Sequence, residues 1–280
     1  MKKSYFKLLP YCTWILFLIL APTLIVFSFA FLNEDFRLTF ENFKRISNYL
    51  KIISKSLVFT TIATTLCLLI AYPVSYFASK IKSELYKKIF IVIITLPIWT
   101  NLLLRTYSWM TILENNGLLN RFLIFLKLKP IHIINTPVAI IIVMAYDFLP
   151  FMILPIYTTI CKINKNLIQA SEDLGANTFQ TFRYILLPLS APGILSGVSI
   201  VFVSCACSFL IPRLLGGGSN VLIGELIESQ FMGTIYNPWF GSALSIFFML
   251  LIGVIIYITN KLNKTETENL PIWLKKLFLK

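Results

Sequence analysis

The sequence predicts an all-α polytopic membrane protein with six transmembrane helices and one polar helical segment between the fourth and fifth of them. Hydrophobic residues make up 57% of the 280 residues and charged residues only 13%, whereas soluble domains carry about 25% charged residues. The apolar residues gather in six long stretches, and a helix needs about 20 such residues to cross a bilayer. We therefore expect a single transmembrane domain over residues 1–280.

The six expected spans differ in their charge content. Four of them carry no charged residue, while the third contains only Arg105 and the fourth only Asp147. The first stretch has too long an apolar core for a cleaved signal peptide, and no clear small-x-small cleavage site follows it, so we expect a retained helix. The spans are expected at about residues 11–32, 56–79, 89–113, 133–160, 189–212 and 240–260.

The basic residues predict the orientation of these spans. With both termini in the cytoplasm, 15 lysines and arginines fall in cytoplasmic segments and 9 in outer loops. Cytoplasmic loops of membrane proteins carry an excess of basic residues. We therefore expect both termini inside the cell, and the net charge of +13 needs no other explanation. Nucleic-acid binding is not expected, because no basic stripe lies on a soluble domain.

The sequence argues against metal or catalytic chemistry. The chain has one histidine, His132, and its cysteines form no CxxC pair, so neither a zinc site nor a Cys/His nucleophile is expected. A polytopic membrane enzyme would need converging catalytic groups, but Asp147 lies about 22 Å from His132 along one helix. The five cysteines are interpreted as small buried hydrophobic residues: Cys12, Cys67, Cys161, Cys205 and Cys207.

The polar segment, residues 164–188, has strong local signals for two short helices. Asn164 or Asn166 can cap the start of the first helix. Gly175 is suited to end it, because glycine tolerates the left-handed conformation at a helix C-terminus. Asn177 with Gln180 three residues later resembles a capping box that starts the second helix. The orientation predicted above places this helix-turn-helix unit in the cytoplasm.

The polar segment resembles the motif of permease subunits of bacterial ABC importers. That motif reads Glu-Ala-Ala, three residues, Gly, nine residues, Ile, one residue, Leu-Pro, and every interval agrees here. Glutamine replaces the glutamate and serine the second alanine. Glutamine keeps the length and the hydrogen bonding of glutamate but lacks the charge that a salt bridge to a partner would need. The matching residues are Gln169, Ala170, Ser171, Gly175, Ile185, Leu187 and Pro188.

The resemblance implies a MetI-like six-helix fold in the bacterial cytoplasmic (inner) membrane. It also implies that the polar segment is a coupling helix that docks in a groove of a dimeric cytoplasmic ATPase, with Glu172 and Leu174 in the contact. The further implied partners are a second homologous permease, an extracellular or periplasmic binding protein and membrane lipid. The run Gly216–Gly218 is not followed by Gly-Lys-Ser/Thr, so we expect no cofactor on this chain, with ATP and Mg bound by the ATPase subunits.

Four further stretches resemble one branch of this family, the first permease subunit of spermidine/putrescine importers. Permeases for iron, phosphonates and other small solutes share the architecture and some of these sequence stretches, so such cargoes remain alternatives to a polyamine. A membrane enzyme is a weaker alternative. The stretches are NLLLRTYSWMTILENNGLLN (101–120), FLPFMILPIYTTI (148–160), GGGSNVLIGELIESQF (216–231) and NPWFGSALSI (237–246).

A polyamine would need carboxylates and aromatic faces along its path. Asp147 is the only acid inside an expected span, and an ionisable residue there is a functional candidate by default. An ion pair with Arg105 is the equally weighted alternative. Three aromatic residues could offer cation–π faces, although helix or lipid packing is the commoner use of membrane aromatics: Tyr107, Trp109 and Tyr146.

Two acids mark the last outer loop. Glu225 and Glu228 lie three residues apart and therefore on one helix face. They could attract cations to the outer mouth of a path, or they could simply form a solvated helix face.

Overall fold

The structure is a computed structural model that describes residues 13–233 and 236–268. Within these ranges the chain is helical apart from its connections, and its one β contact is an isolated antiparallel bridge between Leu32 and Leu38. The predicted all-α class is therefore confirmed. The lysines of the N-terminal tail and the last three lysines of the chain, which contribute to the predicted orientation, lie outside the described residues, as do Cys12 and the first two residues of the expected span 11–32.

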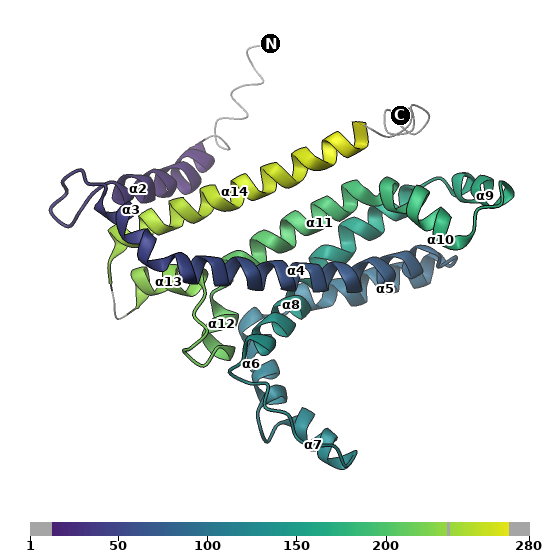
Figure 1. The fold of residues 1–280 in the computed structure, drawn as a ribbon, viewed down its shortest axis with the longest axis horizontal. Coiled ribbons are helices and arrows are strands. Elements are labelled where there is room, and N and C mark those ends of the chain that lie inside the picture. The colour runs from purple at the N-terminus through teal and green to yellow at the C-terminus, as the bar shows by residue number, and fades with distance from the viewer. Residues whose placement is uncertain (1–12, 234–235, 269–280) are drawn as a thin grey trace, which may run out of the picture.

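Four long helices, α4, α8, α11 and α14, run along the long axis of the molecule, and α6 and α7 project to one side (Figure 1). The described elements are η2 (Leu16–Leu20), α2 (Ala21–Ala30), α3 (Glu41–Arg45), η3 (Ile46–Tyr49), α4 (Leu50–Ser79), α5 (Glu84–Trp99), α6 (Leu102–Leu113), α7 (Leu118–Phe125), α8 (Pro137–Lys162), α9 (Lys165–Asp173), α10 (Thr178–Thr181), η4 (Phe182–Leu186), α11 (Leu187–Cys207), α12 (Leu210–Leu215), α13 (Ile223–Met232) and α14 (Pro238–Glu268).

Five helical stretches in the described part of the chain are long and apolar enough to cross a membrane. They overlap five of the six expected spans and cover residues 13–30, 41–79, 137–162, 178–207 and 238–259. A sixth crossing exists only if a bent pair of helices, Glu84–Trp99 and Leu102–Phe125, is counted as one span.

The third expected span, residues 89–113, differs from a single helix. The two halves of the pair meet at an angle of 92°. Pro97 lies in the last turn of α5, and Thr100 and Asn101 are extended. The Asn101 side chain then caps α6 by accepting a hydrogen bond of 2.8 Å from the Leu103 backbone N–H. The sequence therefore stops one helix and starts another inside an apolar run.

The fifth expected span, residues 189–212, is also divided. Helix α11 ends at Cys207, Ser208 is extended, and the short α12 begins at Leu210. The apolar run is thus longer than the helix that it forms, and its last residues belong to the loop region that also contains α13.

The core lies where α8 contacts α4 and α11. Its fully buried residues include Met144, Met152 and Ile156 of α8. Helix α14 forms a second layer with α2 and α13. Lipid is as apolar as the helices, so close van der Waals packing, rather than removal of apolar surface from water, holds such helices together.

Two glycines of α11 allow this packing to be close. A Cβ atom placed on Gly193 would lie 2.5 Å from Thr159 Oγ1 and 2.6 Å from the Pro155 carbonyl oxygen, both in α8. One on Gly197 would lie 2.8 Å from the Met152 sulfur. A real Cβ on Gly193 would push the two helices apart, because the Pro155 carbonyl is backbone, whereas one on Gly197 would first displace the Met152 side chain.

We expect Gly193→Ala to lower the thermal unfolding midpoint of the detergent-purified protein, because overpacking costs roughly 1–3 kcal/mol. Gly253→Ala in α14 is the matched control, since nothing lies within 4 Å of its Cβ position. Alanine is favoured over glycine inside a helix by about 1 kcal/mol, so this control should be neutral or stabilising. Equal midpoints for the two variants would contradict the close contact between α8 and α11.

Candidate functional site

The polar segment folds as a capped helix-turn-helix. The Asn164 side chain accepts a 3.0 Å hydrogen bond from the Asn166 N–H at the start of α9. Gly175 has φ +82°, the left-handed conformation expected of it. Asn177 and Gln180 form the expected capping box, with two reciprocal hydrogen bonds of 2.8 Å each. The local signals in the sequence were therefore sufficient to predict this unit.

A buried contact between two hydroxyl groups joins the two helices of the polar segment. Ser171 Oγ lies 3.0 Å from Thr181 Oγ1, and it also donates a 2.7 Å hydrogen bond to the Ile168 carbonyl. Both side chains are buried. Serine at position 171, a departure from the family pattern, thus contributes a contact that alanine cannot make. Thr181 cannot be recognised from the sequence as the partner of Ser171, because the pair forms across the glycine turn and has no periodic signal.

The outer surface of the polar segment combines polar and apolar side chains. Leu174 is 88% exposed and Phe179 65% exposed at the turn. A cavity of about 370 Å³ is lined by residues on both sides of Gly175. Large apolar side chains exposed at a polar tip are typical of a surface that contacts a partner.

The predicted coupling residues separate into three groups in the structure. Ser171 faces inward, and Ile185 and Pro188 are half-buried where the chain enters the bundle. The others are exposed at the surface: Gln169, Ala170, Glu172, Leu174, Gly175 and Leu187.

Helices α10, η4 and α11 form one continuous helical stretch, Thr178–Cys207. It includes a π-helical turn at Phe182–Leu186. Phe182 packs edge-on against the Tyr72 ring of α4 with 5.4 Å between ring centroids. The Tyr72 hydroxyl lies 3.0 Å from Ser190 Oγ of α11. The polar segment is therefore fixed to the membrane-spanning helices rather than linked to them by a loose loop.

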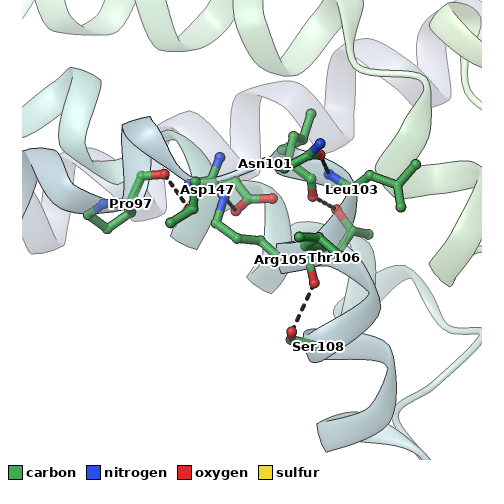
Figure 2. A network of polar contacts seen from close by, with 10 residues as sticks. Pro97, Asn101, Leu103, Arg105, Thr106, Ser108 and Asp147 are labelled. Carbon is green, nitrogen blue, oxygen red and sulfur yellow. Dashed lines mark hydrogen bonds and ion pairs between the residues drawn. The ribbon is translucent and has the colours of Figure 1, made fainter.

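Inside the bundle, Arg105 and Asp147 form an ion pair, as Figure 2 shows. Arg105 Nε lies 3.4 Å from Asp147 Oδ1, and the Asp147 side chain is fully buried. The distance is long for a charge-assisted hydrogen bond. Neither carboxylate oxygen has a hydrogen-bond partner in the described part of the chain. The 92° bend places the start of α6, and with it Arg105, beside Asp147 of α8 (Figure 2).

The three candidate aromatic residues do not form a cage. Trp109 and Tyr146 pack against each other in a T-shaped pair with 5.1 Å between ring centroids. Tyr107 is 45% exposed. The pair thus joins α6 to α8, which is the packing alternative, and Tyr146 is 40% exposed.

Glu225 and Glu228 lie on α13, and their environments differ. Arg213 Nη1 donates to both Glu228 carboxylate oxygens at 2.6 Å. Burial raises the pKa of Glu225, and the nearby Arg213 charge partly offsets this. The ion pair between Arg213 and Glu228 could not be predicted from the sequence, because 15 residues and two helix boundaries separate the two side chains.

We expect Arg105→Gln to lower the stability of the purified protein by about 3 kcal/mol, because it leaves a buried carboxylate without its partner. Combining it with Asp147→Asn removes the charge altogether and should restore most of the thermal unfolding midpoint. Stability losses that simply add in the double variant would show that the two side chains are not coupled.

The fold is shared with solved importer structures. A bacterial ABC transporter that imports the acidic polysaccharide alginate matches 94% of this chain and 95% of its own, with a TM-score of 0.79 at 18% identity. A chain of the MetNI methionine ABC transporter in an inward-facing conformation matches 79% of this chain and 97% of its own, with a TM-score of 0.56 at 17% identity. The predicted MetI-like fold is therefore confirmed.

Curated relatives cover nearly the whole chain. The spermidine/putrescine transport system permease protein PotB of Haemophilus influenzae is 40% identical over 263 residues, which are 90% of this chain and 91% of the relative. PotB of Escherichia coli (strain K12) is 34% identical over 256 residues, 88% of this chain and 92% of the relative. These relatives are transport proteins rather than enzymes.

The family model described as binding-protein-dependent transport system inner membrane component matches residues 13–265. Helix content, apolar spans and the spacing of the polar segment agree with this match, and the chain belongs to this family of inner membrane transport components.

Proposed function

We propose that this chain is a permease subunit of an ATP-driven importer of the polyamines spermidine and putrescine. The assignment of polyamines as the cargo is supported chiefly by the 40% identity to a spermidine/putrescine permease along 91% of that protein. The weakly satisfied carboxylate of Asp147 supports the same cargo, because an ammonium group could provide the hydrogen bonds that Arg105 does not supply.

The polar segment is the site at which a separate ATPase acts on this chain. Its capped helices, the Ser171–Thr181 contact and the exposed Leu174 make it a stiff projection with an apolar tip. Because α10 continues into α11, a push on the tip moves α11 as a unit. Helix α11 packs directly on α8, which carries Asp147. Closure of the ATPase would then change access to the centre of the bundle.

The topology supports cytoplasmic termini. Helices α9 and α10 lie at the same end of the molecule as the C-terminal end of α14 and the connection between α4 and α5 (Figure 1). Four lysines in that connection and in the first turns of α5 favour the cytoplasm: Lys80, Lys82, Lys87 and Lys88. Helices α12 and α13 lie at the opposite end, where the acidic face of α13 would meet incoming cations.

The complex would contain further subunits. A second homologous permease completes the path, an ATPase dimer binds ATP and Mg, and an external binding protein delivers the polyamine. One solved relative of the fold is an alginate ABC transporter in complex with an alginate-bound periplasmic protein, which supports an external delivery protein for this architecture.

We expect Gly175→Val to abolish ATP-driven uptake and to reduce co-purification of the ATPase, because a β-branched residue at φ +82° distorts the turn. Gly218→Val is the matched control. Gly218 has φ +74° and, like Gly175, no atom within 4 Å of its Cβ position, so it carries similar backbone strain at the other end of the molecule. ATPase recovery that falls equally with both variants would argue against the polar segment as the docking site.

We expect spermidine or putrescine to stimulate ATP hydrolysis several-fold when the assembled complex and its binding protein are reconstituted in proteoliposomes. Iron and a phosphonate, tested at equal concentrations, serve as the alternative cargoes. Stimulation by one of these and by no polyamine would overturn the cargo while leaving the importer assignment intact. Hydrolysis that responds to none of the solutes would count against the importer itself.

A further inference from the structure

A cavity of about 460 Å³ lies between the polar segment and the ends of the membrane-spanning helices. Its walls come from the C-terminal ends of α4 and α8, the beginning of α5, the first turns of α9, and η4. The lining comes from two segments that are distant in the sequence, 76–87 and 160–186, so the cavity is a product of the tertiary fold. One side of it belongs to the polar segment, and its floor belongs to the bundle.

The lining of this cavity is strongly basic. Lys80, Lys82 and Lys87 line it, and no aspartate or glutamate does. Lys87 is neutralised by Glu84, whose Oε1 lies 2.5 Å from its Nζ. Lys80 and Lys82 have no carboxylate partner in the described part of the chain. Two positive charges therefore face one cavity without compensation.

The remaining lining is suited to an amphiphile. The Tyr76 ring lies 4.2 Å from Lys80 Nζ and forms a cation–π contact with it. Ile160 and Leu186 add apolar surface. The lysines stand directly after the apolar span that ends at Ser79, the depth at which lipid headgroups meet a protein. Basic pockets between spans on the cytoplasmic side bind anionic headgroups.

Gln169 leaves the positive charge of this cavity unopposed from the α9 side. It lines the cavity from the α9 side at the position where the family motif has glutamate. A glutamate there would place a carboxylate among the lysines and could pair with one of them. The amide of glutamine instead leaves both lysines without a carboxylate partner and offers two N–H donors to an oxygen ligand.

We propose that this cavity binds the phosphate group of an anionic phospholipid. The phosphate oxygens would be held by Lys80 and Lys82 with the Gln169 amide, while the glycerol and first acyl carbons lie against the apolar floor. The bound headgroup would bridge α9 to the end of α4 and brace the polar segment against the bundle. This inference depends on membrane insertion and on neither polyamine transport nor ATPase docking.

The test uses the full-length chain, purified in a non-ionic detergent and titrated with phosphatidylglycerol, with phosphatidylcholine as the zwitterionic control. Binding to the folded state raises the thermal unfolding midpoint in a concentration-dependent way. We expect phosphatidylglycerol to raise it and phosphatidylcholine to leave it unchanged. Lys80→Gln combined with Lys82→Gln should weaken the apparent affinity for phosphatidylglycerol at least tenfold.

Lys88→Gln is the matched control, because Lys88 is an exposed lysine of α5 that does not line the cavity. It should retain the affinity of the unaltered chain. Gln169→Glu, read out by lipid binding alone, should also weaken the affinity, and it remains informative if the double lysine variant fails to fold. Unaltered phosphatidylglycerol affinity in both variants would overturn the site.

Two competition experiments distinguish a bound lipid from a free anion and from a protein contact. Inorganic phosphate that stabilises the chain as strongly as phosphatidylglycerol at equal concentration would replace the lipid with a free anion and overturn the proposal as stated. Loss of bound phosphatidylglycerol when the purified ATPase is added would mean that the basic cavity is a protein contact, and that result would overturn it as well. Retention of the lipid in the presence of both competitors is the expected outcome.

Discussion

Gly193 and Gly197 bring α11 so near to α8 that a Cβ atom on either glycine would collide with α8. This contact is the direct mechanical connection between the helix that leaves the polar segment and the helix that carries Asp147. Helix α11 begins in the polar segment, and α8 holds the buried Asp147. Close-packed interiors have low compressibility and transmit strain. Under the proposed function, a displacement of α9 and α10 would therefore reach α8 through this helix contact, without a special relay of side chains.

The ion pairs of the protein differ in how well they are satisfied. Arg213 and Glu228 meet through two contacts of 2.6 Å at the surface. In contrast, the buried Asp147 lies 3.4 Å from the half-buried Arg105, and neither of its carboxylate oxygens has a hydrogen-bond partner in the described part of the chain. An unpaired charge inside a membrane costs several kcal/mol, about 2.5 or more. The structure thus keeps a costly and incompletely satisfied carboxylate at its centre. Such a group gains more from an incoming ammonium than a fully bonded one would.

The sequence predicted those features that depend on neighbouring residues. The left-handed Gly175 and the capping box at Asn177 follow from side chains within three or four positions, so their chemistry is visible in the sequence. The 92° bend after Trp99 was missed, because an apolar run of this length also suits a straight helix and the cap at Asn101 lies inside it. The Ser171–Thr181 contact and the partnership of Arg213 with Glu228 depend on tertiary approach, which no periodicity encodes.

Burial along the chain is uneven, and this bears on how a path could form. Only 6% of the first described span is buried, compared with 56% of the most apolar 18-residue window of α8. An apolar helix that its own chain leaves uncovered must meet lipid or another subunit. The exposed surface extends over α11, of whose span only 28% is buried, although α11 is the helix that continues from the polar segment. A second permease packed against α11 would cover this surface. Movements of the polar segment would then be transmitted to that subunit through its contact with α11. The uneven burial therefore agrees with the proposed second permease, with the exposed side of α11 as part of this chain's contact surface and α8 packed behind it.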